Sequence, residues 1–205
     1  MPESAPHRGR PRDAARDRAL LEATLAVLAE SGYGGLTTAT VAARAGVSTA
    51  TLYRRWSSKE ELVIAAVSAY AGDLGDHPDT GSLEGDLRDL LRDKAVALTG
   101  TSGQLIRTLI GEAAHNDALA VSLTDALMKP VRRRVDDIVR RAVARGDIAP
   151  LADSDLVGDL VIGPVVSLFT LAPVPPDHVP VDEATAAADR LLPFVMRAMG
   201  AKGTG

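Results

Sequence analysis

The sequence predicts an all-α fold, and three observations support that prediction. Apolar residues recur three or four positions apart in almost every segment, which is the spacing that one face of an α-helix requires. Thr37, Ser48 and Ser58 stand directly before such segments, where a side-chain oxygen can accept a hydrogen bond from a free amide at a helix start. No segment alternates with the period of a β-strand. We expect about nine helices.

The N-terminal third predicts a helix-turn-helix after one longer helix over residues 17–35. Thr37 caps a short helix that ends at Gly46, the residue type best able to take a left-handed backbone conformation. Ser48 caps the next short helix, which is followed by a longer helix that opens at Ser58. The second short helix should turn Leu52 and Trp56 inward. Its outer side, which a DNA groove would meet, then carries Thr49, Ala50, Tyr53 and Arg54.

Charge is divided unevenly along the chain. Residues 1–59 carry nine Arg and Lys against five Asp and Glu, a net charge of +4, and residues 60–205 carry fourteen against twenty-two, a net charge of −8. This division should steer the N-terminal end towards phosphates. The first 17 residues, rich in Pro, Gly and Arg, are expected to be disordered without a partner. Arg8, Arg10 and Arg12 either form an arm that enters a minor groove or belong to a solvated tail.

At residues 37–62 the chain resembles the DNA-binding domain of the tetracycline-repressor (TetR) family of bacterial transcription regulators. The family pattern T-x-x-x-[IV]-A-x-x-A-G-V-S-x-x-T-L-Y-x-x-[FW]-x-x-K-E-x-L matches at Thr37, Val41, Ala42, Ala45, Gly46, Val47, Ser48, Thr51, Leu52, Tyr53, Trp56, Lys59, Glu60 and Leu62. The chain departs from the pattern at Thr49, where the family often has a basic residue, and this departure bears on base preference. The resemblance implies a helix-turn-helix domain of three helices over residues 1–62. It also implies a helical domain for ligand sensing and dimerisation over residues 63–205.

Residue roles at the DNA follow from side-chain chemistry. Thr49 and Ala50 are expected to contact base edges through thymine methyl groups. Arg54 or Arg44 is expected to contact a guanine or a phosphate. The side chains expected to position phosphates are those of Thr37, Ser48, Tyr53 and Lys59.

The rest of the chain predicts helices over residues 82–98, 104–115, 117–145, 153–171 and 181–199. Asp117 can cap the third of these helices, and Pro130 should kink or restart it. The run Arg132 to Arg134 is interpreted as a solvated, paired helix face rather than a second nucleic-acid patch. The last two helices carry more apolar surface than one small monomer needs, which predicts a four-helix interface with a second copy. The residues expected there are Leu156, Leu160, Val161, Leu168, Leu191 and Val195.

The resemblance also implies that a small, often apolar molecule binds between the middle helices and releases DNA. Four polar or bulky side chains on otherwise apolar helices are the candidate lining residues, namely Arg107, His115, Met128 and Phe169. Each has an ordinary alternative, because a lone His is more often a surface residue and Met is more often core. Two Phe and three Tyr are little aromatic material for a large stacking pocket.

Other classes of protein fit the sequence less well. The chain has no Cys and four dispersed His, without metal-ligand spacing, and no nucleophile motif or phosphate loop, so no enzyme, metal or cofactor is expected. A DNA recombinase would need a separate catalytic domain. No apolar run reaches the length of a membrane span, and the N-terminus lacks a signal-peptide core, which predicts a bacterial cytoplasmic protein. A palindromic double-stranded operator is the expected partner, and a regulator or architectural protein without a small-molecule inducer is the alternative.

Overall fold

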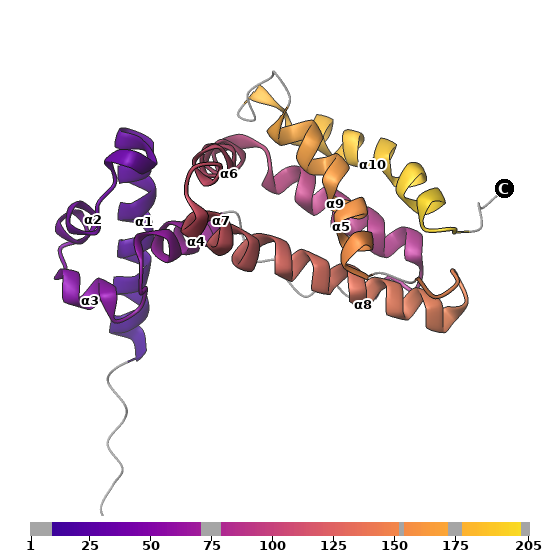
Figure 1. Cartoon of the computed structure of the whole chain (residues 1–205), viewed down its shortest axis with the longest axis horizontal. Coiled ribbons are helices and arrows are strands. Elements are labelled where there is room, and N and C mark those ends of the chain that lie inside the picture. Colours follow the sequence, from indigo (N-terminus) through magenta and orange to yellow (C-terminus); the bar gives the residue numbers. More distant parts are fainter. Residues whose placement is uncertain (1–9, 71–78, 152–153, 172–177, 202–205) are drawn as a thin grey trace, which may run out of the picture.

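The computed structural model describes residues 10–70, 79–151, 154–171 and 178–201, and all regular structure in these residues is helical (Figure 1). The elements in chain order are α1 (Arg10–Gly35), α2 (Thr38–Arg44), α3 (Thr49–Tyr53), α4 (Lys59–Tyr70), α5 (Leu83–Ala97), α6 (Gly100–Ala113), α7 (Asp117–Leu123), η1 (Thr124–Met128), α8 (Lys129–Arg145), α9 (Ser154–Thr170) and α10 (Val181–Ala198). Because α7, η1 and α8 follow one another without a break, they form one long helix, and the all-α prediction is confirmed.

The N-terminal helices follow the predicted order, with two differences. Helix α1 bends at Gly32, whose φ of 67° lies in the left-handed region that favours glycine. It begins at Arg10, so residues 10–17 are helical rather than disordered as expected. Two features of the sequence favour a helix here. Pro11 lies in the first turn, where its missing N–H removes no hydrogen bond, and it is followed by alanines, which have the highest helix propensity. Arg8 and the side chains of Arg10 and Arg12 lie outside the described residues.

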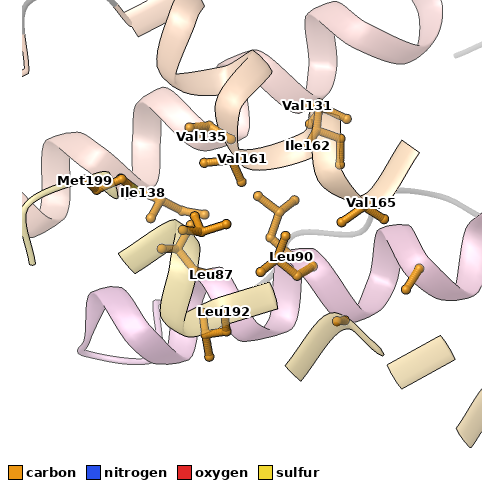
Figure 2. Packing of buried hydrophobic residues seen from close by; sticks show 14 of the residues in the cluster. Leu87, Leu90, Val131, Val135, Ile138, Val161, Ile162, Val165, Leu192 and Met199 are labelled. Atoms are coloured by element: carbon orange, nitrogen blue, oxygen red, sulfur yellow. The ribbon is translucent and has the colours of Figure 1, made fainter. Parts of the chain in front are cut away.

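Two apolar clusters organise the described part of the chain. The distal cluster joins α5, α8, α9 and α10, and Figure 2 shows ten of its members by name. Its buried residues are Leu83, Leu87, Leu90, Leu91, Ala95, Val131, Val135, Ile138, Ala142, Ile148, Val161, Ile162, Val165, Phe169, Ala184, Ala187, Ala188, Leu192, Val195 and Met199.

The head cluster joins α1 to α4 with α6 and α7. Its buried residues are Leu20, Ala23, Val27, Leu28, Tyr33, Leu36, Val41, Ala42, Leu52, Leu62, Val63, Ile64, Val67, Leu105, Ile106, Leu109, Leu119 and Leu123. The predicted division after residue 62 falls inside α4, and α6 and α7 pack on the helix-turn-helix side of the molecule. Helices α6 and α7 therefore pack directly against the helices that carry the helix-turn-helix.

The joint between the clusters lies in the long helix. Pro130 has no N–H for the carbonyl of Ala126, and its ring would crowd that carbonyl, so the α-helical pattern is interrupted here as predicted. The interruption takes the form of the π-helical turn η1, in which the Lys129 amide donates to the Thr124 carbonyl. Leu127 packs against the head cluster and Met128 against the distal cluster. The turn thus marks the point where the helix passes from one cluster to the other.

Helix ends differ from the predictions by a few residues elsewhere. Helix α6 begins at Gly100 rather than at residue 104, after Thr99 in an extended conformation. Asn116, rather than Asp117, caps α7, because its side-chain oxygen accepts a hydrogen bond from the Leu119 amide at 3.0 Å. None of the helices in the described ranges is long and apolar enough to cross a bilayer.

Candidate nucleic-acid interface

Thr37 and Ser48 begin the two short helices by the predicted capping bonds. The Thr37 hydroxyl accepts from the Thr40 amide at 3.1 Å, and the Thr40 hydroxyl accepts from the Thr37 amide at 3.1 Å. The Ser48 hydroxyl accepts from the Thr51 amide at 3.2 Å. Gly46 turns the chain between the helices with a φ of 66°. These local bonds fix how α2 and α3 enter the head.

The outer side of α3 is the one that the sequence predicts. Leu52 has no exposed surface and packs in the head cluster, with Trp56 partly buried against the same cluster. Four side chains of the helix and its C-cap are exposed, namely those of Thr49, Ala50, Tyr53 and Arg54, while Thr51 is half-buried. Tyr53 is 50% exposed, and its hydroxyl lies 3.0 Å from the Thr38 hydroxyl at the start of α2. The tyrosine ring is therefore held between the two short helices.

Basic side chains gather where α1 begins and α3 ends. Arg55 forms an ion pair with Asp17, which places the early turns of α1 beside the end of α3, as the lower part of Figure 1 also shows. Arg16 and Arg54 are both exposed near this contact. This edge of the head thus concentrates the positive charge that the sequence assigns to its N-terminal part.

Arg44 is less available than the sequence suggests. Its Nη1 donates to Glu30 Oε2 at 2.6 Å across the surface between α2 and α1. The hydrogen bond from Arg44 lowers the pKa of Glu30. To bind a guanine or a phosphate, the guanidinium must leave Glu30 or use its remaining donors.

Lys59 lies at a junction that the sequence does not predict. Its Nζ donates to the Tyr33 carbonyl at 2.6 Å and lies 4.1 Å from the centre of the Tyr33 ring. Burial lowers the pKa of this ammonium group. Lys59 therefore ties the start of α4 to the end of α1, and only its two other ammonium protons are left for a phosphate.

Tyr33 also connects the head to α7. Its hydroxyl donates to Glu60 Oε1 at 2.7 Å, and Asn116 Nδ2 donates to the hydroxyl at 3.4 Å. Burial alone would raise the pKa of Glu60, but its hydrogen bonds, with Tyr33 first, bring that pKa below its ordinary value. We call Tyr33, Lys59, Glu60 and Asn116 the Tyr33 junction. It is a polar contact between α1, α4 and the start of α7 beside the head cluster.

Comparison with known proteins decides the family. The family described as "Bacterial regulatory proteins, tetR family" matches residues 20–66, and that described as "Tetracyclin repressor-like, C-terminal domain" matches residues 77–188. The chain belongs to the TetR family. It is therefore a DNA-binding transcriptional regulator with a helix-turn-helix, as the sequence predicts.

Individual members of the TetR family resemble the chain over most of its length. An HTH-type transcriptional regulator of Mycobacterium bovis is 35% identical over 186 residues, which are 90% of this chain and 90% of that protein. A DNA-binding transcriptional repressor, TetR, of Mycobacteroides abscessus is 36% identical over 160 residues, 76% of this chain and 83% of that protein. The solved structure of AibR with isovaleryl coenzyme A and operator DNA has a TM-score of 0.54 and 25% identity, and covers 87% of this chain and 97% of that one.

The four candidate ligand residues of this TetR family protein do not lie together in one group. Phe169 is 6% exposed in the distal cluster, and Met128 is half-buried against the same cluster. Arg107 is half-buried on α6. His115 is exposed in the turn between α6 and α7, outside both clusters, which argues against a buried lining role.

Lys94 is the functional candidate that the sequence argument missed. It is 7% exposed on α5, and it has no hydrogen bond or ion pair within residues 10–70, 79–151, 154–171 and 178–201. Lysine is almost never buried without a partner. The signal was present, because Leu87, Leu91, Lys94 and Leu98 follow one another at helical spacing, and the lysine interrupts an otherwise apolar stripe.

Exposed apolar side chains follow the outer side of the last two helices. Leu156 is 67% exposed, Leu160 42% and Leu168 45%, all on α9, and Phe194 on α10 is 67% exposed. Leu171, just after α9, is 75% exposed. Positions 156, 160, 163, 167 and 171 all lie on one side of the helix and are exposed. This side of the chain is available to a partner.

Two residues predicted for that surface require correction. Val161 has no exposed surface and Val195 is 3% exposed, because both point into the distal cluster of their own chain. Leu191 is half-buried against the same cluster. Helices α9 and α10 are apolar on two sides, and the sequence pattern alone does not say which side covers the core.

The arginine run on α8 is paired, as expected. Arg132 makes a two-pronged contact with Asp159 at 2.9 and 3.0 Å, and Arg134 lies 3.3 Å from Asp93. Exposed Arg133 donates to the Lys129 carbonyl at 3.4 Å. These contacts favour a structural role over a second nucleic-acid patch.

Proposed function

We propose that the protein is a homodimeric repressor that binds a palindromic operator and is released when a small molecule binds its helical domain. The main support for this proposal is the exposed outer side of α3. Buried Leu52 and the capping bond of Ser48 hold the helix in this orientation. A short, rigid helix that offers small side chains outward suits the major groove.

In this proposal, Thr49 and Ala50 contact base edges and Arg54 contacts a base or a phosphate. Thr37, Ser48 and Tyr53 orient the backbone phosphates. The Tyr53 hydroxyl supports this assignment, because its contact with Thr38 holds it at the exposed edge between α2 and α3. Arg16, on the same edge as Arg54, is an additional candidate phosphate contact.

Dimerisation sets the spacing of the two recognition helices. Two-fold packing through α9 and α10 would bury the exposed leucines and Phe194 and place the two α3 helices roughly 34 Å apart, one turn of DNA. A symmetric dimer requires a palindromic operator.

Release of DNA requires a ligand that binds one arrangement of the heads better than the other. The head cluster supports such coupling, since α6 and α7 pack with α1 and α4 in one apolar cluster. The Tyr33 junction adds a polar contact between the same elements. A small shift of α7 would therefore move the head. AibR, which was solved with both an acyl coenzyme A and operator DNA, supports this two-ligand scheme by its similarity. A protein with this function acts in the bacterial cytoplasm, at the chromosome.

Gel retention with DNA from upstream of the protein's own coding region tests the proposal. We expect specific retention that weakens steeply with salt. Absence of retention at low salt would contradict the proposal, and magnesium-dependent cleavage of the DNA would favour the recombinase alternative. Retention that no small molecule relieves would favour a regulator without an inducer.

Lys59→Ala separates two roles of that residue. If Lys59 also contacts a phosphate, the variant should weaken binding to all sequences and lower the slope of log K against log salt by about one. Salt titrations of operator binding measure the slope, with Lys129→Ala on α8 as the control. An unchanged slope combined with a lower melting temperature would leave Lys59 with only its contact to Tyr33.

A further inference from the structure

We propose that Lys94 anchors the acidic group of an aliphatic small-molecule effector inside the helical domain. This inference rests on the proposed response to a ligand and names the chemical class of that ligand. The starting observation is a lysine that is 7% exposed and without a hydrogen bond or ion pair in the described residues. A largely buried lysine without a hydrogen bond or ion pair among the described residues is unfavourable to the fold, and an anion that binds later would offset this effect.

The neighbouring charges do not neutralise Lys94. Asp93 is paired with Arg134, whose side chain is 17% exposed, at 3.3 Å. The positive charge of Arg134 acts unfavourably on Lys94, while the negative charge of Asp93 acts favourably on it. Burial first, and then this repulsion, lower the pKa of Lys94 to about 8, so that the group is still mainly protonated at neutral pH. Among the described residues, Lys94, Arg134 and Asp93 together carry one excess positive charge, which suits one acidic group.

A second polar group without a partner lies at the same end of the distal cluster. Figure 2 shows Leu87 and Leu90 of α5 following the same direction as Val161 and Val165 of α9. One turn further along each helix come Lys94 on α5, and Phe169 and Thr170 on α9. Thr170 is 6% exposed, and its Oγ1 is buried with no hydrogen-bond partner. Thr170 is thus a second hydrogen-bond donor without a partner, and like Lys94 it lies towards the C-terminal end of its helix.

The surroundings favour an aliphatic molecule. Phe169 is the one aromatic residue among the buried members of the distal cluster, and the others are aliphatic side chains and Met199. Met128 packs on the same cluster, and its unbranched thioether chain can move aside for an inserted hydrocarbon. Lys94 also lies one turn before Leu98, which packs against both clusters. An effector bound here would act at the joint between the distal cluster and the head.

Calorimetric binding to the full chain, with three probes of equal chain length, tests the anchor. The probes are octanoate, octyl phosphate and 1-octanol, so the acidic group is varied and the hydrocarbon kept. We expect at least one anion to bind the wild type about tenfold or more tightly than 1-octanol. Lys94→Met should abolish this preference and leave the affinity for 1-octanol unchanged. Lys129→Met, which removes an exposed lysine on α8, is the control and should keep it.

The inference is overturned if Lys94→Met still prefers the anion, or if wild type binds 1-octanol as tightly as both anions. Lys94→Met should fold, because it removes an unpaired buried charge at nearly constant volume, and Lys94→Gln is a second neutral variant.

Gel retention separates this inference from the proposed function. If an anion releases DNA from Lys94→Met as readily as from wild type, Lys94 is not the anchor, and the proposed function is unaffected. If anion binding depends on Lys94 but does not release DNA, the protein is not a ligand-released repressor, and the role of Lys94 as an anchor stands.

Discussion

Asp86→Ala is expected to destabilise the helical domain by about 2 to 4 kcal/mol, because it leaves a polar network without its central acceptor. The Asp86 side chain is 1% exposed. Its carboxylate accepts from the Thr80 amide at 2.9 Å, from the Thr80 hydroxyl at 2.8 Å and from Arg141 at 3.0 Å. Without it, the Thr80 amide loses its acceptor. The two nearby guanidiniums, of Arg141 and Arg145, then keep only exposed Asp79 and half-buried Asp147.

Urea unfolding followed by circular dichroism measures the loss of stability. Asp159→Ala is the matched control, since it removes a carboxylate that also binds an arginine, Arg132, but lies exposed on α9. Exposed pairs contribute roughly 0 to 1 kcal/mol, so the control should lose little. Equal losses in the two variants would mean that the Asp86 network adds no more than a surface ion pair.

The pH dependence of the stability of wild type and of Asp86→Asn checks the electrostatic origin of this stabilisation. Burial alone would raise the pKa of Asp86, but hydrogen bonds from Thr80 and Arg141 outweigh it, and the folded-state pKa lies below its ordinary value. A lowered pKa means that the stabilisation is fully present above the unfolded-state value of about 3.9 and is lost as the pH falls through the folded-state value. The stability difference between wild type and Asp86→Asn should therefore shrink below about pH 4.

Leu160→Glu combined with Phe194→Glu is expected to give a monomer whose affinity for the operator is lower by about a hundredfold or more. The two side chains are 42% and 67% exposed on α9 and α10, so the substitutions put charge on the proposed interface without disturbing the distal cluster. Binding of the second head to an operator benefits from the link to the first, and that benefit is about 10²- to 10⁴-fold in two-site binders. Light scattering and gel retention on the same samples measure the two effects.

Val121→Glu serves as the control for the dimer variant. Val121 is 61% exposed on α7, away from the last two helices, and its replacement should leave both mass and affinity unchanged. If the double variant remained a dimer, the interface would lie on a different surface. A monomer that kept full affinity would instead show that one head is enough for operator binding.

The sequence predicts what is decided locally. Thr37 and Ser48 cap their helices as expected because capping depends on a few neighbouring residues, and Leu52 faces inward because helical spacing sets its direction. The choice between two apolar sides is different. Val161 is buried and adjacent Leu160 is exposed, and only the packing of α5 and α8 against α9 decides between them.

Contacts between distant segments also escape a reading of local patterns. Lys59 matches the family pattern and is expected at the phosphates, but its ammonium binds the carbonyl of Tyr33, 26 residues earlier in the chain. No periodicity predicts that contact. Lys94, in contrast, could have been found from the sequence, because a charged residue at an inward position of an apolar stripe is itself a signal.

The π-helical turn at Thr124–Met128 has a consequence for how insertions and deletions act on this chain. A π turn accommodates one residue more than α-helical hydrogen bonding would, and each residue turns a helix by about 100°. Deleting one residue here would let α7 and α8 join in uninterrupted α-helical phase. Because the π turn takes up the extra residue locally, such a deletion would leave the apolar side of α8, with Val131 and Val135, facing the distal cluster. The turn therefore keeps the two halves of the molecule in rotational register, and a one-residue deletion here should be tolerated better than the same deletion within α8.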